Sequence, residues 1–234
     1  MRIALIENTR ITHHGQMGVA LHEAAARIDL YKPWQDGRLP TAGEHDGLVV
    51  FGGEQAATDD HTHAYLPDLC ALMRDTTASD RAVMGICLGA QLLARAYGGQ
   101  NRLGAAPEFG WHGVSLTDAG RTDPLLAHLP GQFPIFQWHG DTFTLPEGAV
   151  HLAASTAVAA QAFRIGRATY GTQFHFEASR AVVAEWTRTL PGLMETMQPG
   201  WAQDHLARAP TLGVAADAHG LAIARAWVKL VWPP

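Results

Sequence analysis

Cysteine and lysine are scarce in this chain, which has two of each among 234 residues. Two cysteines cannot make the dense disulfide framework of a small secreted protein. One of them, Cys70, lies among leucines in a helical pattern, and we interpret it as a core residue. Lys and Arg never cluster, and 17 basic side chains stand against 22 acidic ones. Because phosphate contacts need concentrated positive charge, we expect no nucleic-acid partner.

Long hydrophobic runs are also absent, so we expect no membrane span and no membrane partner. The first residues read as a strand that turns polar at Glu7, unlike a signal peptide. No Ser- or Pro-rich linker divides the chain, and we predict one domain over residues 1–234.

Strand and helix patterns alternate along the chain. Strands are expected at residues 2–6, 29–34, 48–51, 82–86, 113–116, 135–138, 150–154, 157–165 and 168–174, and helices at 18–28, 66–75, 88–97, 178–189 and 216–231. This alternation predicts an α/β fold, with helices on both faces of a mostly parallel central sheet. Catalytic loops then lie at the carboxyl ends of the strands.

A cysteine stands between an apolar run and a helical pattern in residues 82–93, Ala-Val-Met-Gly-Ile-Cys-Leu-Gly-Ala-Gln-Leu-Leu. We predict a strand, a tight turn at Cys87 and then a helix, which is the arrangement of a nucleophile elbow at a strand end. The amino end of a helix favours a thiolate, and the flanking glycines let the chain turn sharply. The alternative is an inert buried cysteine, so partners elsewhere in the chain decide between the two.

A histidine and a glutamate lie two residues apart in residues 170–177, Tyr-Gly-Thr-Gln-Phe-His-Phe-Glu. The alternation predicts a strand with His175 and Glu177 on one face. A carboxylate beside one ring nitrogen fixes the tautomer and stabilises the imidazolium. The alternative is a solvent-facing pair at a strand end.

Three segments together resemble the class I (triad) glutamine amidotransferases. Residues 85–91 resemble the nucleophile signature of that family, and residues 171–177 resemble its Gly-x-Gln-Phe-His-Pro-Glu signature. Phe51-Gly52-Gly53 stands where the family has its Gly-Gly oxyanion loop. Order and spacing match over roughly residues 40 to 180. The resemblance implies a flavodoxin-like three-layer sandwich that acts on a small-molecule substrate without cofactor or metal.

By this resemblance Cys87 is the nucleophile, His175 is the general base and then acid, and Glu177 orients the imidazole. The thiolate attacks the side-chain amide of glutamine, ammonia leaves, and water hydrolyses the γ-glutamyl thioester. The backbone N–H groups of Gly53 and Leu88 are the expected oxyanion donors.

Substrate contacts are also implied by the resemblance. Gln91 belongs to the nucleophile signature, and Gly52 belongs to the oxyanion loop. A further loop resembles the Ser-His-Gly-Asp of the GMP synthetase glutaminase unit, and it consists of Trp138, His139, Gly140 and Asp141. The alternatives are a solvated helix position for Gln91 and a cap for Asp141.

Two residues depart from the family pattern. Phe176 replaces the proline between the histidine and the glutamate, which restores an N–H and adds bulk. Glu54 follows Gly53, where the family often has Pro or Ser, and we expect it to face solvent or a substrate group.

Three functions remain open. The chain is a glutaminase that serves a synthetase partner chain, a γ-glutamyl peptidase or hydrolase that needs no partner, or a silent binding or regulatory subunit. The sequence has no Gly-rich phosphate-binding loop, and we expect no ATP-using domain after Ala178, so in the first function the ammonia acceptor would lie on another chain. The loop at residues 138–141 favours the first function, and the intact Cys, His and Glu oppose the third. Because a working thiol must stay reduced, we expect a cytoplasmic location.

Overall fold

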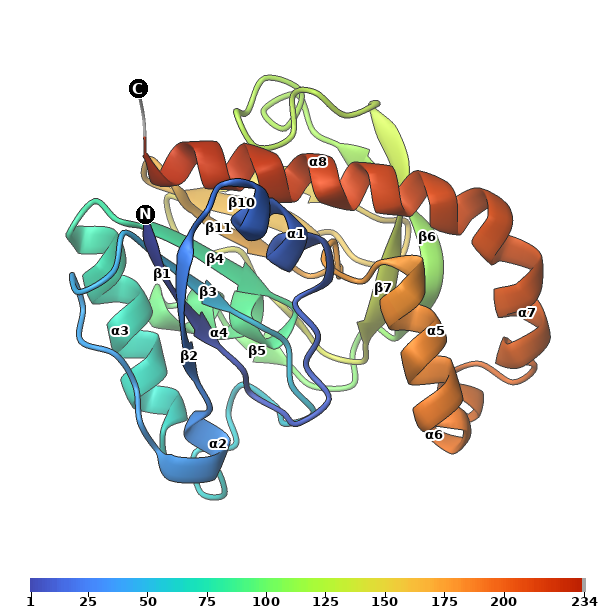
Figure 1. Cartoon of the computed structure of the whole chain (residues 1–234), viewed down its shortest axis with the longest axis horizontal. Coiled ribbons are helices and arrows are strands. Elements are labelled where there is room, and N and C mark those ends of the chain that lie inside the picture. Colours follow the sequence, from blue (N-terminus) through green and yellow to red (C-terminus); the bar gives the residue numbers. More distant parts are fainter. Residues whose placement is uncertain (233–234) are drawn as a thin grey trace.

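A mixed sheet forms the centre of the protein in the computed structural model, which describes residues 1–232 (Figure 1). Its strand order is β2-β1-β3-β4-β11-β10-β9-β6-β7. The strands are β1 (Arg2–Ile6), β2 (Arg27–Tyr31), β3 (Gly47–Val50), β4 (Ala82–Ile86), β6 (Glu108–Leu116), β7 (Gln132–His139), β9 (Val150–Ala154), β10 (Ala162–Ile165) and β11 (Thr169–Thr172). Two short strands, β5 (Asn101–Arg102) and β8 (Thr142–Phe143), pair separately.

The predicted fold class is confirmed. In the order of the sheet, the neighbouring strands β2, β1, β3, β4 and β11 all run parallel. Every residue of β3, β4 and β11 is buried, as expected of strands that lie between two helix layers. The remaining strands extend this sheet with antiparallel pairing. The parallel part therefore carries the strand ends at which the predicted site lies.

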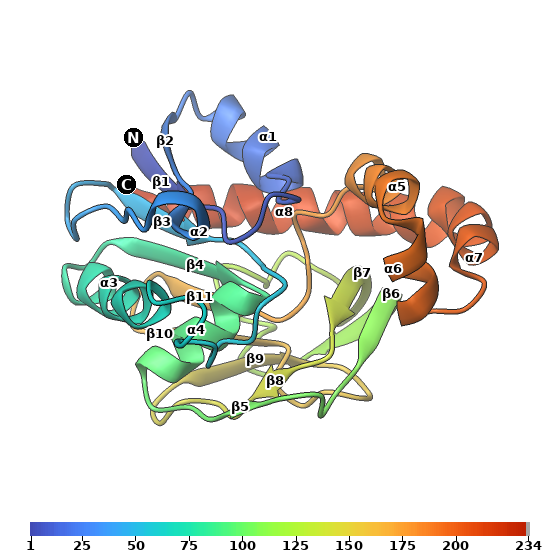
Figure 2. The same cartoon turned by 90° about the horizontal axis from the view of Figure 1, so that it is seen from below.

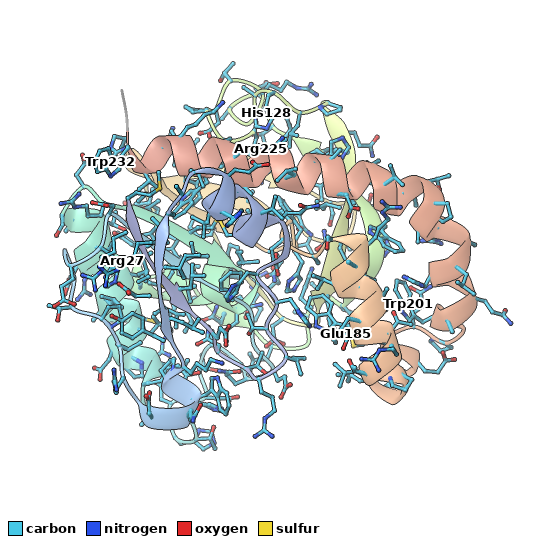
Figure 3. All side chains as sticks on the ribbon, viewed as in Figure 1. Arg27, His128, Glu185, Trp201, Arg225 and Trp232 are labelled. Atoms are coloured by element: carbon cyan, nitrogen blue, oxygen red, sulfur yellow. The ribbon has the colours of Figure 1, made fainter. Side chains whose placement is uncertain are left out.

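Helices cover both faces of the parallel part (Figure 2). On one face lie α1 (Gly15–Glu23) and α8 (Val214–Val231), and on the other lie α3 (Leu66–Ala78) and α4 (Leu88–Ala96). Alternate side chains of β1 enter the two cores, with Leu5 in one and Ile6 in the other. Burial of each such side chain contributes about 1.5–3 kcal/mol. Arg225 of α8, labelled in Figure 3, pairs with Glu23 of α1 at 2.6 Å.

Three further helices lie beside β6 and β7 (Figure 1). They are α5 (Arg180–Thr189), α6 (Pro191–Met197) and α7 (Trp201–Arg208), and a π-helical turn (Ala209–Gly213) joins α7 to α8. Trp201, labelled in Figure 3, packs its ring 4.7 Å from that of Phe109 and 5.8 Å from that of Trp111. These aromatic contacts hold the C-terminal helices against the antiparallel strands.

Several predicted boundaries are wrong for local reasons. The helix expected at 18–28 ends at Glu23, because Ala25 adopts a positive φ of 50° and β2 begins at Arg27. The strand expected at 29–34 ends at Tyr31, since a short helix, α2 (Pro33–Asp36), follows it. The strand expected at 157–165 begins only at Ala162, and the strand expected at 168–174 ends at Thr172.

Candidate active site

Cys87 lies at the tight turn between β4 and α4, as the sequence predicts. Its backbone adopts φ 52° and ψ −108°, a region that residues with a side chain rarely occupy. Such a conformation costs about 1–3 kcal/mol and persists only where surrounding structure enforces it. Here the Cys87 N–H donates to the carbonyl of Thr172 at 2.8 Å, and the Cys87 carbonyl accepts from the N–H of Gln91 at 3.0 Å. The strained turn is therefore fixed on both sides.

A cavity of about 310 Å³ opens in front of this cysteine. The predicted site residues that line it are Gly52, Gly53, Cys87, Gln91, Trp138, His139, Gly140, Asp141, His175 and Glu177. Leu88, the remaining predicted residue, is buried at the start of α4. A Cβ placed on Gly53 would lie 2.8 Å from Cδ2 of Leu88, so these two residues adjoin. The structure thus gathers the predicted residues from distant segments around one cavity.

His175 and Glu177 meet by a route that differs from the predicted one. The alternation after Thr172 is not a strand: His175 makes an isolated bridge to Phe136 of β7, and a turn follows it. After Thr172 the chain departs from β11, and the His175 N–H donates to the Phe136 carbonyl at 2.8 Å. Nδ1 of His175 nevertheless lies 2.7 Å from Oε1 of Glu177. The pair is only 7% and 3% exposed, which excludes the solvent-facing alternative.

The imidazole of His175 also lies close to the thiol. A Cβ placed on Gly52 would lie 3.1 Å from Cε1 of His175 and 3.4 Å from Cβ of Cys87, so one glycine adjoins both residues. Burial by itself lowers the pKa of His175, but the negative charge of Glu177, together with Cys87, holds that pKa well above its ordinary value. A cationic imidazole beside a sulfur atom is the arrangement that favours a thiolate nucleophile.

The turn at residues 176–177 has no proline, and two helices hold it instead. The N–H of Gln16 in α1 donates to the carbonyl of Glu177 at 2.9 Å. Gly15 takes a φ of +45°, and a Cβ there would lie 1.8 Å from the same carbonyl oxygen. In α8, a Cβ on Gly220 would lie 2.1 Å from the carbonyl oxygen of Phe176. Close packing against α1 and α8 therefore replaces the rigidity of the missing proline.

Gln173 touches the thiol, a contact that the sequence motifs did not predict. This side chain is fully buried, and its Nε2 lies 3.7 Å from Sγ of Cys87. Its Oε1 accepts from Nε2 of Gln91 at 3.3 Å, and Nε2 of Gln91 also donates to the carbonyl of Asp141 at 3.3 Å. Both amide hydrogens of Gln91 are thus occupied within the protein, which leaves its Oε1 for a ligand. The available signal was the place of Gln173 in the signature at residues 171–177.

Residues 138–141, which were expected to form a loop, close one side of the cavity from the end of β7, since Trp138 and His139 are its last residues. Nδ1 of His139 hydrogen-bonds the carbonyl of Asp141 at 3.1 Å, and its Nε2 lies 3.3 Å from the carboxylate of Glu108. Oδ1 of Asp141 accepts from the N–H of Gly104 at 2.7 Å. The exposed Glu54 accepts from the hydroxyl of Thr9 at 3.2 Å and stands at the rim of the cavity.

Part of the cavity comes from segments for which the sequence motifs predicted no role in binding. We call its apolar side the outer wall, which consists of Ile11, Trp138, Trp186, Leu193 and Met197. Only Trp138 belongs to a predicted site segment. The others come from the loop before α1 and from α5 and α6. No local motif marks them, because their meeting depends on how the C-terminal helices pack.

Residues 1–232 hold no group of three or more His, Cys, Asp or Glu side chains that could bind a metal ion. Over the same residues, none of the helices combines the length and apolar character that crossing a membrane requires.

Comparison with known proteins points to one family. The model of the glutamine amidotransferase class-I family matches residues 19–183. The glutamine amidotransferase-like protein YfeJ of Salmonella typhimurium is 36% identical over 141 residues, which cover 59% of this chain and 59% of that protein. A subunit of the glutamine-hydrolysing GMP synthase of Natronomonas pharaonis is 30% identical over 187 residues, covering 79% of this chain and 92% of the relative.

Among solved structures, a glutamine amidotransferase from Methylobacillus flagellatus superposes with a TM-score of 0.85 and 26% identity. The match covers 98% of this chain and 94% of that one. It therefore extends over the C-terminal helices as well as over the segment that the family model describes.

Proposed function

We propose that this chain, which belongs to the class I glutamine amidotransferase family, hydrolyses the side-chain amide of glutamine through a thioester on Cys87. The observation that carries the proposal is the meeting of Cys87, His175 and Glu177 at one cavity, with the imidazole and carboxylate 2.7 Å apart. Sulfur nucleophile, proton carrier and orienting group are the three parts that acyl transfer by a cysteine needs.

The reaction follows from these roles. The Cys87 thiolate attacks the amide carbonyl, a C–S bond forms, and the carbonyl electrons move to oxygen. The N–H groups of Gly53 and Leu88 hold this oxyanion, a contribution of about 3 kcal/mol for one donor in comparable sites. His175 gives its proton to nitrogen as the C–N bond breaks and ammonia leaves. A water molecule then loses a proton to His175, attacks the thioester and releases glutamate.

We call the part of the cavity around Cys87, His175 and Glu177 its inner end. The glutamine itself would contact the other residues there. Gly52 adjoins the reacting sulfur, and Oε1 of Gln91 is available because both hydrogens of its amide are occupied. The backbone of residues 138–141 borders the same space. We assign substrate binding to these residues.

A partner chain would receive the ammonia. The similarity to a protein that is one subunit of a GMP synthase supports this assignment. If a partner chain uses the ammonia, the isolated chain should release ammonia slowly. Addition of the partner that binds the ammonia acceptor should accelerate the release. A cytoplasmic location suits the chemistry, since a working thiol must stay reduced.

A second candidate is a γ-glutamyl hydrolase that acts without a partner. The outer wall favours it, because ammonia is too small and too polar to need apolar contacts. The same catalytic residues serve both functions, since only the leaving group differs.

Covalent labelling tests the proposed chemistry. A γ-diazoketone analogue of glutamine should alkylate the protein once, which mass spectrometry would show as the added mass of one analogue without its N₂. Peptide mapping should find the adduct on Cys87. Cys87→Ala should lose the label and all glutamate release. Cys70→Ala is the matched control and should keep both, because burial raises the pKa of the Cys70 thiol to about 11. A wild-type protein that takes no label would instead be catalytically silent.

A further inference from the structure

We propose that the outer wall binds the leaving group, and that the preferred substrates are γ-glutamyl amides of neutral apolar amines, aromatic ones above all. This inference rests on the Cys87 chemistry of the proposed function and develops its second candidate, the γ-glutamyl hydrolase, by naming the amide that forms the thioester. It identifies the amine side of the scissile bond as the part of the substrate that the chain selects.

The outer wall stands where the leaving group departs. His175 protonates the leaving nitrogen, so any substituent on that nitrogen emerges beside the imidazole. The ring of Trp186 packs edge-on against that of His175 with centroids 6.1 Å apart. It also packs against the ring of Trp138 at 5.0 Å. A substituent that leaves the imidazole therefore meets these two indole rings.

The outer wall is already formed without a ligand. Nε1 of Trp186 donates to the carbonyl of Ile11 at 3.1 Å, which fixes the orientation of its indole. Trp186 is only 5% exposed, whereas Leu193 is 42% exposed. The wall thus runs from a rigid aromatic floor beside His175 toward an open apolar rim on α6. Rigid aromatic surfaces bind apolar groups at little entropic cost.

Size and charge restrict the leaving group further. The cavity of about 310 Å³ falls at the lower end of the range for small-ligand pockets, about 300–1,000 Å³. Its lining contains no Lys or Arg, while Glu54 stands at the rim. An amine that carries its own carboxylate would find no lysine or arginine there, and the basic side chains of the lining are all histidines. A neutral amine fits better than an amino acid, so γ-glutamyl-phenylethylamide should be preferred to γ-glutamyl-phenylalanine.

Glutamate release measures the preference directly, because every substrate of this class yields the same product. We expect kcat/KM of the wild-type chain to be at least about 10-fold higher for γ-glutamyl-phenylethylamide than for glutamine, since one methylene in an apolar pocket is worth about 10-fold or more. Equal or higher kcat/KM for glutamine would overturn the inference and leave the proposed function intact. No Cys87-dependent glutamate release from either compound would overturn both.

Variants of the rim locate the preference. Leu193→Ala combined with Met197→Ala should lower the ratio of kcat/KM for γ-glutamyl-phenylethylamide to that for glutamine by about 10-fold. Both residues lie at the open side of the cavity, so the change spares the aromatic floor. The matched control is Leu206→Ala on α7, because Leu206 is 73% exposed and does not line the cavity. It should keep the wild-type ratio. A double variant that keeps the ratio as well would show that the outer wall does not select the amine.

Discussion

The inner end of the cavity and its outer wall differ in origin and in rigidity. Cys87, His175 and Glu177 lie within residues 19–183, which the family model matches, and backbone hydrogen bonds tie them to the sheet. Ile11, Leu193 and Met197 lie outside that segment, as does Trp186, and the wall ends in an exposed leucine. The difference separates two tasks. In the proposed reaction the matched segment supplies the reacting groups and Trp138, and the flanking segments supply the rest of the surface that would meet the leaving group.

Changes at the inner end should lower turnover for every substrate. After the complete loss expected for Cys87→Ala, the largest decrease should come from replacing His175. His175→Ala is expected to lower kcat by about 10⁴-fold, because it removes the group that we propose protonates the leaving nitrogen. Glu177→Gln should lower it by about 10²-fold, since it disturbs orientation and charge but leaves the ring in place. Glutamate release from glutamine and from γ-glutamyl-phenylethylamide measures both. Equal losses in the two variants would mean that Glu177 does more than orient the ring.

A smaller effect should follow from the contact between Gln173 and the sulfur atom. Gln173→Leu removes the Nε2 donor 3.7 Å from Sγ and leaves Nε2 of Gln91 with one acceptor fewer. We expect alkylation of Cys87 by the diazoketone to slow by about 10-fold. Its pH profile should also move to higher pH, which a purely structural role would not cause. A lower melting temperature with an unchanged alkylation profile would assign Gln173 to the scaffold alone.

The smallest effect should appear in stability rather than in turnover. The pKa of His175 is higher in the folded protein than in the unfolded chain, where it is about 6.5. Protonation of His175 therefore stabilises the fold fully below about pH 6.5, and this contribution is lost as pH rises through the folded-state pKa. Each unit of pKa difference corresponds to about 1.4 kcal/mol.

Glu177→Gln tests this dependence, because it removes the charge that raises the pKa of His175. Urea unfolding of the wild-type chain between pH 6 and 9 should show a free energy of unfolding that falls with pH. The variant should show a flatter decline. Parallel curves for the two proteins would contradict the electrostatic coupling of His175 with Glu177.

Local patterns in the sequence predicted which residues meet at the inner end of the cavity. For one pair of residues, however, the predicted backbone conformation was wrong. The turn at Cys87 follows from an apolar run, a glycine and a helical pattern within a few residues, and the structure has it there. The contact of His175 with Glu177 was predicted from strand alternation, yet a turn produces it. Two-residue spacing brings side chains together in either backbone conformation, so the error in conformation did not alter the predicted pair.

The outer wall could not be predicted in the same way. Leu193 and Met197 reach the cavity because α6 folds back after Pro191, and Trp186 is held by a bond to Ile11 from the other end of the chain. Such contacts depend on tertiary packing, and no short motif encodes them. Gln173 was within reach of sequence reasoning, since a buried amide between two strand-like residues needs partners.

The close approach of Gly220 to the Phe176 carbonyl makes the long helix α8 a support for the turn that carries His175 and Glu177. A methyl group on residue 220 would collide with the Phe176 carbonyl, so we expect Gly220→Ala to displace the turn at residues 176–177 and to leave the sheet in place. A screen for inactive yet folded variants should therefore recover positions on α8, far along the chain from any signature residue and outside the lining of the cavity.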